Sequence, residues 1–271
     1  MLRRQNTKGE SEMKLAFIGT GNMGGALARA AALEQGNELL LVNRHPEKAE
    51  KLRSEIGGSV TDHAEAVAEA DLLFLGVKPV VLPALCETLR PLLRAREGRL
   101  VIVSMVAGVP ILKLQEELGE KLPVIRIMPN TPVAVGEGMI LYSCSEEVCE
   151  EEAERFLQAM GHAGRFMKIE ERLMEAGMAV SGCGPAYVDL FVEALADAAV
   201  ACGLPRKDAV QIAAQMVLGS AKLILESGRH PGELKDAVCS PGGTTIQGVR
   251  ALEARAFRSA VFEAVMAAHD A

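Results

Sequence analysis

Short apolar segments alternate with amphipathic ones from Lys14 to about Lys168. The apolar segments are hydrophobic at nearly every position rather than at alternate positions, as in KLAFIG (14–19), ELLLVN (38–43), DLLFLGV (71–77) and RLVIVSM (99–105). Continuous apolar runs of this length are typical of strands covered on both faces, and the amphipathic segments between them predict the covering helices. We therefore expect a doubly wound, mainly parallel sheet in an α/β domain that spans residues 13–169.

The strand pattern ends after a short apolar segment near residues 165–169. Residues 172–269 have a helical pattern throughout, and it is broken only where Gly and Pro gather, at 182–185, 203–205, 229–232 and 240–243. The pattern predicts a second, all-helical domain over residues 170–271. Its helices at 185–202 and 207–226 are apolar around much of their circumference, so we expect this domain to join subunits in a homo-oligomer. The alternative is that these helices bury one another.

The composition favours a small-molecule substrate over a macromolecular partner. The net charge is -7, aromatic residues make up 3% and Trp is absent, so the chain lacks the basic surface and the stacking platforms that nucleic-acid binding uses. No apolar run approaches the roughly 20 residues that span a bilayer. We expect a soluble protein that binds neither nucleic acid nor membrane.

Residues 1–12 and the cysteines bear on the compartment. Residues 1–12 are polar, aperiodic and without the apolar core of a signal peptide, and they predict a flexible extension. The six cysteines are scattered, with no C-x-x-C pair and no His-rich segment that would indicate a metal site. We interpret the cysteines as small buried hydrophobes in a protein of the reducing cytoplasm.

A glycine motif lies directly after the first predicted strand. In FIGTGNMG, Gly19, Gly21 and Gly24 have G-x-G-x-x-G spacing at the start of a helix. The first glycine permits the tight turn, the second lets the backbone approach a pyrophosphate and the third allows close helix packing. This context predicts a Rossmann-type dinucleotide site, in which Ile18 ends the strand, and Thr20, Asn22 and Met23 contribute amides and shape.

The end of the second strand indicates which dinucleotide binds. An acidic residue there would bind the ribose 2′-hydroxyl of NAD, whereas this chain has Asn43 and Arg44, followed by Lys48. Donors and positive charge suit a 2′-phosphate, so NADPH is expected, with NADH as a possible second cofactor. The alternative is that Arg44 is a solvated surface charge.

Two further loops follow strands on the same edge of the predicted sheet. The first, GVKP, contains Gly76, Val77, Lys78 and Pro79, and the second, in SMVAGV, contains Met105, Val106 and Ala107. Open α/β sheets bind ligands at the carboxyl ends of their strands, so we expect both loops to line the cofactor. For the second loop, an ordinary strand-to-helix turn explains the spacing nearly as well.

The segment SPGGTT (240–245) predicts an anion site in the helical domain. Gly and Pro lead into a helix that begins near Thr244 and Thr245, so free amides and hydroxyls are directed at one point, which suits a small carboxylate. The alternative is a plain N-cap formed by Ser240 or Thr244.

These residues resemble pyrroline-5-carboxylate reductases, from Met13 to the end of the chain. The resemblance rests on FIGTGNMG, VKP, AGV, MPNTP (128–132), SGCGPAY (181–187), GLPR, HPGELKD (230–236) and SPGGTT. It implies reduction of (S)-1-pyrroline-5-carboxylate to L-proline by hydride transfer from NADPH, the last step of proline biosynthesis. It also implies a homodimer joined by interlocked helical domains, which can stack into a homodecamer.

The resemblance also implies roles for single residues. Gly243 and Thr244 would hold the substrate carboxylate through backbone amides, and Thr245 would place its hydroxyl beside the ring nitrogen as the catalytic donor. Glu171 and Val238 match positions that face the cofactor in relatives. His230, a lone histidine before a proline, is interpreted as a helix-capping or interface residue.

Two other functions remain open on the sequence alone. One is another NADP-dependent dehydrogenase with a helical second domain, such as a β-hydroxyacid or prephenate dehydrogenase, which would need a Lys or His base in that domain. The other is a dinucleotide-binding regulator without catalytic activity.

Overall fold

A computed structural model of the protein describes residues 13–271 and divides them into two compact units. The first ends at Gly182, and the second runs from Cys183 to Ala271. The flexible extension predicted for residues 1–12 lies outside the described residues. The domain boundary predicted at residue 170 stays a prediction.

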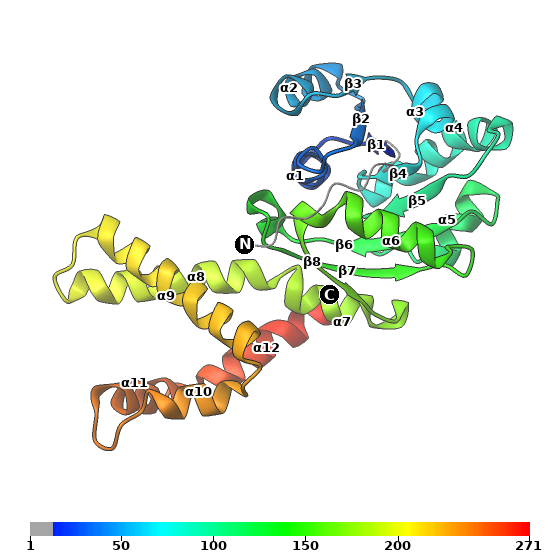
Figure 1. The fold of residues 1–271 in the computed structure, drawn as a ribbon. Coiled ribbons are helices and arrows are strands. Elements are labelled where there is room, and N and C mark those ends of the chain that lie inside the picture. Colours follow the sequence, from blue (N-terminus) through cyan, green and yellow to red (C-terminus); the bar gives the residue numbers. More distant parts are fainter. Residues whose placement is uncertain (1–12) are drawn as a thin grey trace, which may run out of the picture. The chain divides into compact units, whose positions relative to one another are not determined.

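The first unit is built on one eight-stranded sheet with the order β3-β2-β1-β4-β5-β6-β7-β8 (Figure 1). The strands are β1 (Met13–Ile18), β2 (Asn37–Val42), β3 (Ser59–Val60), β4 (Leu72–Leu75), β5 (Val101–Ser104), β6 (Val124–Met128), β7 (Gly138–Cys144) and β8 (Gly164–Lys168). The order reverses direction at β1, which pairs with both β2 and β4 in parallel. This is the doubly wound, Rossmann-type arrangement that the apolar runs predict.

Helices cover both faces of the sheet, as the continuous burial of the strands requires. Every residue of β4, β5 and β6 is buried. Helices α1 (Asn22–Ala31), α2 (Pro46–Ile56) and α6 (Glu150–Ala159) share one hydrophobic cluster with one face of the strands. Helices α3 (His63–Glu69), α4 (Leu82–Ala95) and α5 (Ile111–Leu118) share the second cluster, with the other face.

One strand departs from the parallel pattern. Strand β7 pairs with β6 in antiparallel register, because a short 3-10 helix, η2 (Thr131–Val135), and a left-handed Gly136 turn the chain back. Strand β8 then pairs in parallel with β7. The unit ends with the 3-10 helix η4 (Glu171–Leu173) and helix α7 (Met174–Ser181). The sheet is therefore mainly parallel, as expected, with one reversed strand that the apolar pattern did not reveal.

The second unit is helical throughout. It contains α8 (Gly184–Ala201), α9 (Arg206–Ser227), α10 (Pro231–Ala237), α11 (Thr244–Glu253) and α12 (Phe257–His269). The breaks at 203–205, 229–232 and 240–243 fall where Gly and Pro predict them. A further break falls before α12, where Ala256 adopts a left-handed conformation with φ of 55°. No Gly or Pro marks that turn, so the sequence pattern missed it.

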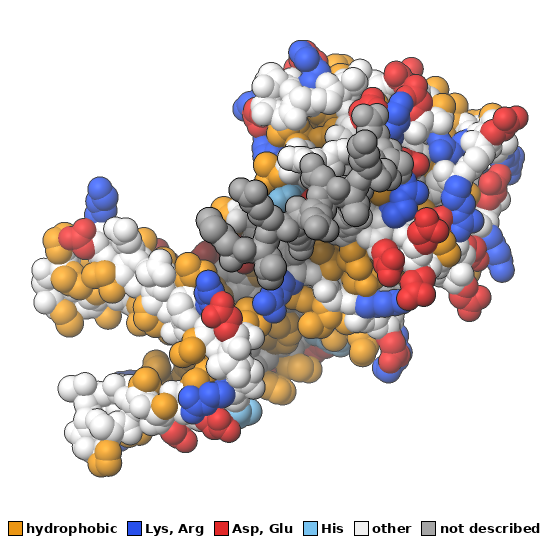
Figure 2. All heavy atoms as spheres, viewed as in Figure 1, with side chains coloured by type: hydrophobic (Ala, Val, Ile, Leu, Met, Phe, Trp, Pro, Cys, Tyr) orange, Lys and Arg blue, Asp and Glu red, His pale blue; other side chains and the backbone are white. Residues whose placement is uncertain are grey.

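The helices of the second unit do not bury one another within a single chain. Only three hydrophobic residues there, Ala196, Ala209 and Ala213, are buried, whereas large apolar side chains such as Leu190 and Phe262 are 68% and 64% exposed. Hydrophobic side chains accordingly lie at the surface over this part of the chain (Figure 2). The alternative of mutual burial is therefore wrong for the isolated chain.

Helix α9 differs from the expectation that no segment is long and apolar enough to span a bilayer. With 22 residues it is long and apolar enough to cross a membrane, by length and composition alone. The sequence pattern missed it because Gln, Ser and Lys interrupt the apolar residues, although the average over the helix is apolar. One such helix is weak evidence for a membrane span, and the same composition suits a helix that a partner subunit covers.

The cysteines differ from the expectation that all are buried. Cys86 is buried, and burial raises the pKa of its thiol to about 11, so it is a buried hydrophobe as predicted. Cys149 and Cys202 are exposed, and Cys144, Cys183 and Cys239 are half-buried. Cys149 is exposed because it begins helix α6 at the surface, where its backbone N–H donates to Glu152.

Candidate active site

The glycine turn lies between β1 and α1, and its three glycines meet different surroundings. A Cβ atom on Gly19 would lie 2.5 Å from the Gly76 carbonyl oxygen, and one on Gly24 would lie 2.0 Å from the Gly19 carbonyl oxygen. Gly19 also has a φ of 96°, which side-chain-bearing residues rarely adopt. At Gly21, in contrast, a Cβ atom would meet nothing within 4 Å. The first and third glycines allow backbone packing, and the second leaves open space at the helix N-terminus.

Asn43 connects the loop after β2 to the glycine turn. Its Nδ2 donates to Thr20 Oγ1 at 2.7 Å, and its Oδ1 accepts from the backbone N–H of His45 at 2.9 Å. Both ends of the amide are therefore engaged, which fixes the turn that carries Arg44. Arg44 is exposed, as a residue that meets a charged ligand from solvent must be.

A cavity of about 250 Å³ lies beside this turn, between α1 and α2. Its lining residues are Thr20, Gly21, Asn22, Arg29, Lys48, Lys51, Leu52 and Glu55. Arg29 is paired with Glu55 at 2.5 Å, so the two lysines supply the net positive charge of the lining. The cavity suits an anionic group held next to the glycine turn.

The loops after β4 and β5 meet the glycine turn at the same edge of the sheet. A Cβ atom on Gly76 would lie 2.8 Å from the Gly19 carbonyl oxygen and 3.3 Å from Met105 Sδ. Lys78 and Pro79 are exposed beyond it, at the start of the 3-10 helix η1 (Pro79–Val81). The structure therefore brings together the residues predicted on these three loops: Ile18, Gly19, Thr20, Gly21, Asn22, Met23, Gly24, Gly76, Val77, Lys78, Pro79, Met105, Val106 and Ala107.

Two of the predicted residues, Val106 and Glu171, have side chains that contact other parts of the protein. Val106 is 1% exposed and packs in the core, so it can offer a ligand only its backbone. Glu171 accepts a hydrogen bond from the Ile111 backbone N–H at 2.7 Å and pairs with Arg126. The loop of residues 105–110 therefore leads into a helix whose first amide is capped by Glu171.

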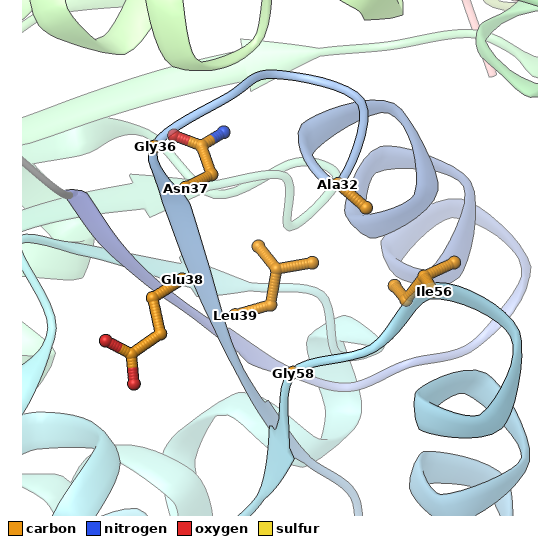
Figure 3. A pocket seen from close by; sticks show the side chains of 7 residues that line it. All are labelled: Ala32, Gly36, Asn37, Glu38, Leu39, Ile56 and Gly58. Atoms are coloured by element: carbon orange, nitrogen blue, oxygen red, sulfur yellow. The ribbon is translucent and has the colours of Figure 1, made fainter.

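A larger cavity, of about 440 Å³, lies at the opposite end of β2 (Figure 3). Asn37, Glu38 and Leu39, at the start of that strand, line it together with Ile56 and Gly58. No predicted site residue is in its lining, which places it away from the glycine turn. Among residues 13–271, no group of three or more His, Cys, Asp or Glu residues is placed to hold a metal ion.

In the second unit, helix α11 begins at Thr244 with Gly243 as its N-cap, and no side chain caps it. A plain N-cap formed by Ser240 or Thr244 is therefore wrong. A Cβ atom on Gly243 would lie 2.4 Å from Ser240 Oγ, a side-chain atom that can rotate away, and 3.2 Å from the Ser240 carbonyl oxygen. Thr244 and Thr245 are both exposed at the helix start, and the first amides of the helix are open to an anion.

Helix α10 shows the role of His230. Its ring nitrogen Nδ1 accepts from the Gly232 backbone N–H at 3.1 Å, which makes it the N-cap of that helix. The prediction of a capping histidine is confirmed. Val238 follows the same helix and is 64% exposed.

Sequence reasoning missed Arg126, Glu175 and Asn130. Arg126 is a buried arginine on β6 that pairs with Glu175 at 2.6 Å, and Asn130 joins the Ser181 carbonyl to the Met139 N–H. The sequence offered one indication, the charged Arg126 inside the apolar run VIRIM. A charged side chain in a strand buried on both faces needs a partner of opposite charge.

Comparison with known proteins extends this picture over the whole chain. Residues 14–108 match the family model described as NADP oxidoreductase coenzyme F420-dependent, and residues 171–271 match pyrroline-5-carboxylate reductase dimerisation. The chain is 40% identical over 259 residues to the pyrroline-5-carboxylate reductase of Escherichia coli (strain K12), covering 94% of this chain and 95% of that protein. It is 38% identical to that of Pisum sativum, covering 94% and 93%.

Solved structures agree with this relationship. The pyrroline-5-carboxylate reductase of Coxiella burnetii superposes with a TM-score of 0.87 at 31% identity, covering 96% of this chain and 97% of that chain. The Plasmodium falciparum pyrroline carboxylate reductase with NADP bound superposes with a TM-score of 0.85, also at 31% identity, covering 97% of each chain. A prephenate dehydrogenase of A. aeolicus shares the fold alone, at 12% identity and a TM-score of 0.53.

The glycine turn on a doubly wound sheet, followed by a helical dimerisation region, defines a two-part oxidoreductase with a nicotinamide dinucleotide cofactor. The match over nearly the full length of both chains is more specific than this class. The chain belongs to the pyrroline-5-carboxylate reductase family.

Proposed function

We propose that this chain reduces (S)-1-pyrroline-5-carboxylate to L-proline with a hydride from NADPH, as the last step of proline biosynthesis. The observation that carries the proposal is the uncapped N-terminus of α11, in a chain that aligns along its whole length with reductases of this name. The substrate for which those relatives are named, pyrroline-5-carboxylate, is a small anion, and a helix N-terminus with free amides suits its carboxylate.

The residues of the first unit suit the dinucleotide. We propose that the open space at Gly21 admits the pyrophosphate to the α1 N-terminus, and that the loops of residues 76–79 and 105–107 line the remainder of the cofactor. The bound cofactor would supply the hydride. The protein's contribution is a closely packed cradle, because a Cβ atom on Gly19, Gly24 or Gly76 would collide with a backbone carbonyl oxygen.

We propose that the loop after β2 gives the protein a preference for NADPH over NADH. The residue at the end of β2 is Asn43 and not an acidic residue. The Asn43 amide holds the turn that carries Arg44 through two hydrogen bonds. Lys48 and Lys51 line the adjoining cavity. We propose that Arg44 and these lysines attract the 2′-phosphate, while NADH, which lacks this group, binds more weakly.

The residues of the second unit suit the substrate. We propose that the amides of Gly243 and Thr244 hold the carboxylate and that the Thr245 hydroxyl donates to the ring nitrogen. A cyclic imine becomes a strong hydride acceptor once protonated, so the protein needs to orient it and direct a proton, without a strongly perturbed acid. Val238 and, in the first unit, Glu171 are proposed to lie near the cofactor.

We also propose that residues 170–271 form the dimerisation and substrate domain of a homodimer, which can stack into a homodecamer in the cytoplasm. The dimerisation family model, which begins at residue 171, supports the dimer. The exposed apolar side chains of the second unit need a covering surface, and a second copy supplies it.

The test follows the loss of NADPH absorbance with purified protein and (S)-1-pyrroline-5-carboxylate, repeated with NADH and with a six-membered cyclic imine. We expect proline as product and a higher kcat/KM with NADPH than with NADH. Tight NADPH binding without oxidation would support a regulator instead. Thr245→Ala tests the donor role, with Thr245→Ser as the control that keeps the hydroxyl, and unchanged turnover in Thr245→Ala would remove that role.

A further inference from the structure

A buried arginine joins three elements near the candidate cofactor loops. Arg126 lies on β6 and is 3% exposed. Its Nη1 lies 3.2 Å from Glu171 Oε1 and its Nη2 lies 2.6 Å from Glu175 Oε1. A guanidinium can hold two separate carboxylates in a fixed geometry, which a lysine ammonium does less well. Arg126 therefore fixes η4 and the start of α7 to the sheet.

Glu171 extends this connection to the cofactor edge. The same oxygen, Oε1, that faces Arg126 accepts a hydrogen bond at 2.7 Å from the backbone N–H of Ile111, the first residue of α5. The N-cap position of α5 is Pro110, which has no side-chain group to offer, so Glu171 supplies the missing acceptor from 60 residues away. The end of the loop of residues 105–110 is held by Glu171.

The start of that loop is held by the sheet. The Met105 backbone N–H donates to the Leu75 carbonyl at 3.2 Å, and the Val106 N–H donates to Ser104 Oγ at 3.3 Å. Between these bonds and Glu171, the Val109 side chain is 6% exposed and packs in the second hydrophobic cluster. Glu171 adds the side-chain hydrogen bond that joins the far end of the loop to η4.

Helix α7 cannot readily yield at this point, because its other end is also fastened. Asn130 Nδ2 donates to the Ser181 carbonyl at 2.9 Å, and Asn130 Oδ1 accepts from the Met139 N–H at 2.9 Å. A Cβ atom on Gly177 would lie 2.2 Å from Leu141 Cδ1, so the helix lies closely against β7. Glu171 is thus presented from a rigid support.

We infer that Arg126 and Glu171 form a positioning pair, in which Arg126 orients the Glu171 carboxylate and Glu171 sets the loop of residues 105–110 against the dinucleotide. The inference rests on the proposed cofactor role of that loop. Glu171 acts through the loop and need not touch the cofactor. A displacement of about 1 Å at such a loop is enough to lower catalysis by up to about a hundredfold.

Arg96 provides a comparison within the same unit, where it is the C-cap of α4. Like Arg126, it has a buried Nε without a hydrogen-bond partner among the described residues. Its other nitrogens donate to the carbonyls of Val67 in α3 and of Ala70 and Arg99, which precede β4 and β5 at the edge of the sheet opposite to the glycine turn. Arg96 is therefore a half-buried structural arginine that does not contact the cofactor edge.

The experiment compares Glu171→Ala, Glu171→Gln, Arg126→Lys and Arg96→Lys. Steady-state kinetics give KM for NADPH and for pyrroline-5-carboxylate separately, and deuterated NADPH gives the primary isotope effect. We expect Glu171→Ala to lower kcat/KM for NADPH by about tenfold, with a smaller change in KM for the imine and a larger isotope effect. Glu171→Gln keeps an acceptor for the Ile111 N–H and should recover most of the loss, and Arg126→Lys should fall between them.

Arg96→Lys separates positioning from stability. We expect it to lower the unfolding midpoint while leaving the kinetic constants at their wild-type values. Wild-type kinetics in Glu171→Ala, or equal kinetic losses in Arg96→Lys and Arg126→Lys, would overturn the inference. NADPH affinity from nicotinamide fluorescence needs no turnover, so the variants can be ranked even if the proposed substrate fails.

Discussion

Gly21→Ala separates the role of the glycine turn in binding from its role in folding. A Cβ atom at Gly24 would collide with the Gly19 carbonyl oxygen, whereas one at Gly21 meets nothing within 4 Å, and Gly21 has an ordinary φ of -74°. Alanine therefore fits the protein itself at this position. Any large effect of the substitution must come from a group that approaches Gly21 from outside.

The expected magnitudes differ strongly between the two properties. Alanine is a poorer N-cap than glycine, but it also reduces the entropy of the unfolded chain, and the two effects of about 0.5–1 kcal/mol oppose each other. The free energy of unfolding should change by less than about 1 kcal/mol. A methyl group that keeps a phosphate oxygen from one amide removes a charge-assisted hydrogen bond, about 1.5–3 kcal/mol, which weakens NADPH binding by about 10- to 150-fold.

The chain is convenient for this measurement because it contains no Trp and two Tyr, so the nicotinamide emission of NADPH is seen against little protein fluorescence. A titration gives the dissociation constant, and urea unfolding gives the stability. Gly161→Ala is the control, since a Cβ atom there also meets nothing within 4 Å but the residue lies outside the candidate site. Wild-type affinity in Gly21→Ala, or an unfolded protein, would refute the reasoning.

Three further predictions concern single positions. Asn43→Asp places a carboxylate where the 2′-phosphate is expected and should lower the ratio of kcat/KM for NADPH to that for NADH by about tenfold; an unchanged ratio would argue against this subsite. The hydrogen bond from Arg99 lowers the pKa of Glu152, so this carboxylate stabilises the fold above its unfolded pKa and the contribution is lost as pH falls through its folded pKa. Glu152→Gln should therefore cost about 1 kcal/mol in urea unfolding at pH 7, with a gap that closes below about pH 4, and a pH-independent gap would contradict it. Ala256→Gly removes a left-handed alanine and should raise the urea midpoint by the equivalent of about 0.5–1 kcal/mol, whereas a lower midpoint would show that the turn is not strained.

The sheet and the glycine turn were predictable because their causes are local. Runs such as LLFL are buried on both faces and can form only central strands, and the glycine spacing follows directly from the first of them. A Cβ atom would lie 2.0 Å from a carbonyl oxygen at Gly24 and 2.5 Å from one at Gly19, which explains why no other residue would fit there. The uncapped start of α11 was also visible in the sequence, as one of two alternatives.

Features that depend on contacts between distant segments were not predictable. The reversal of β7 shows only in its pairing with β6, and Glu171 caps a helix 60 residues earlier in the chain. The turn at Ala256 carries no Gly or Pro, and an alanine does not by itself favour the left-handed conformation found there. The exposure of Cys149 and Cys202 was likewise not predictable, because it depends on where the folded chain places them and not on the residue type.

The exposed apolar helices of the second unit have a thermodynamic consequence. With three small alanines as its buried hydrophobic residues, this unit gains little free energy from burial within one chain. Most of its stabilisation must then come from surface covered upon association, so its folding free energy includes a mass-action contribution from the protein concentration. Dilution and unfolding are therefore coupled for residues 183–271, and a substitution on their apolar surface changes the folding and the assembly of the protein together.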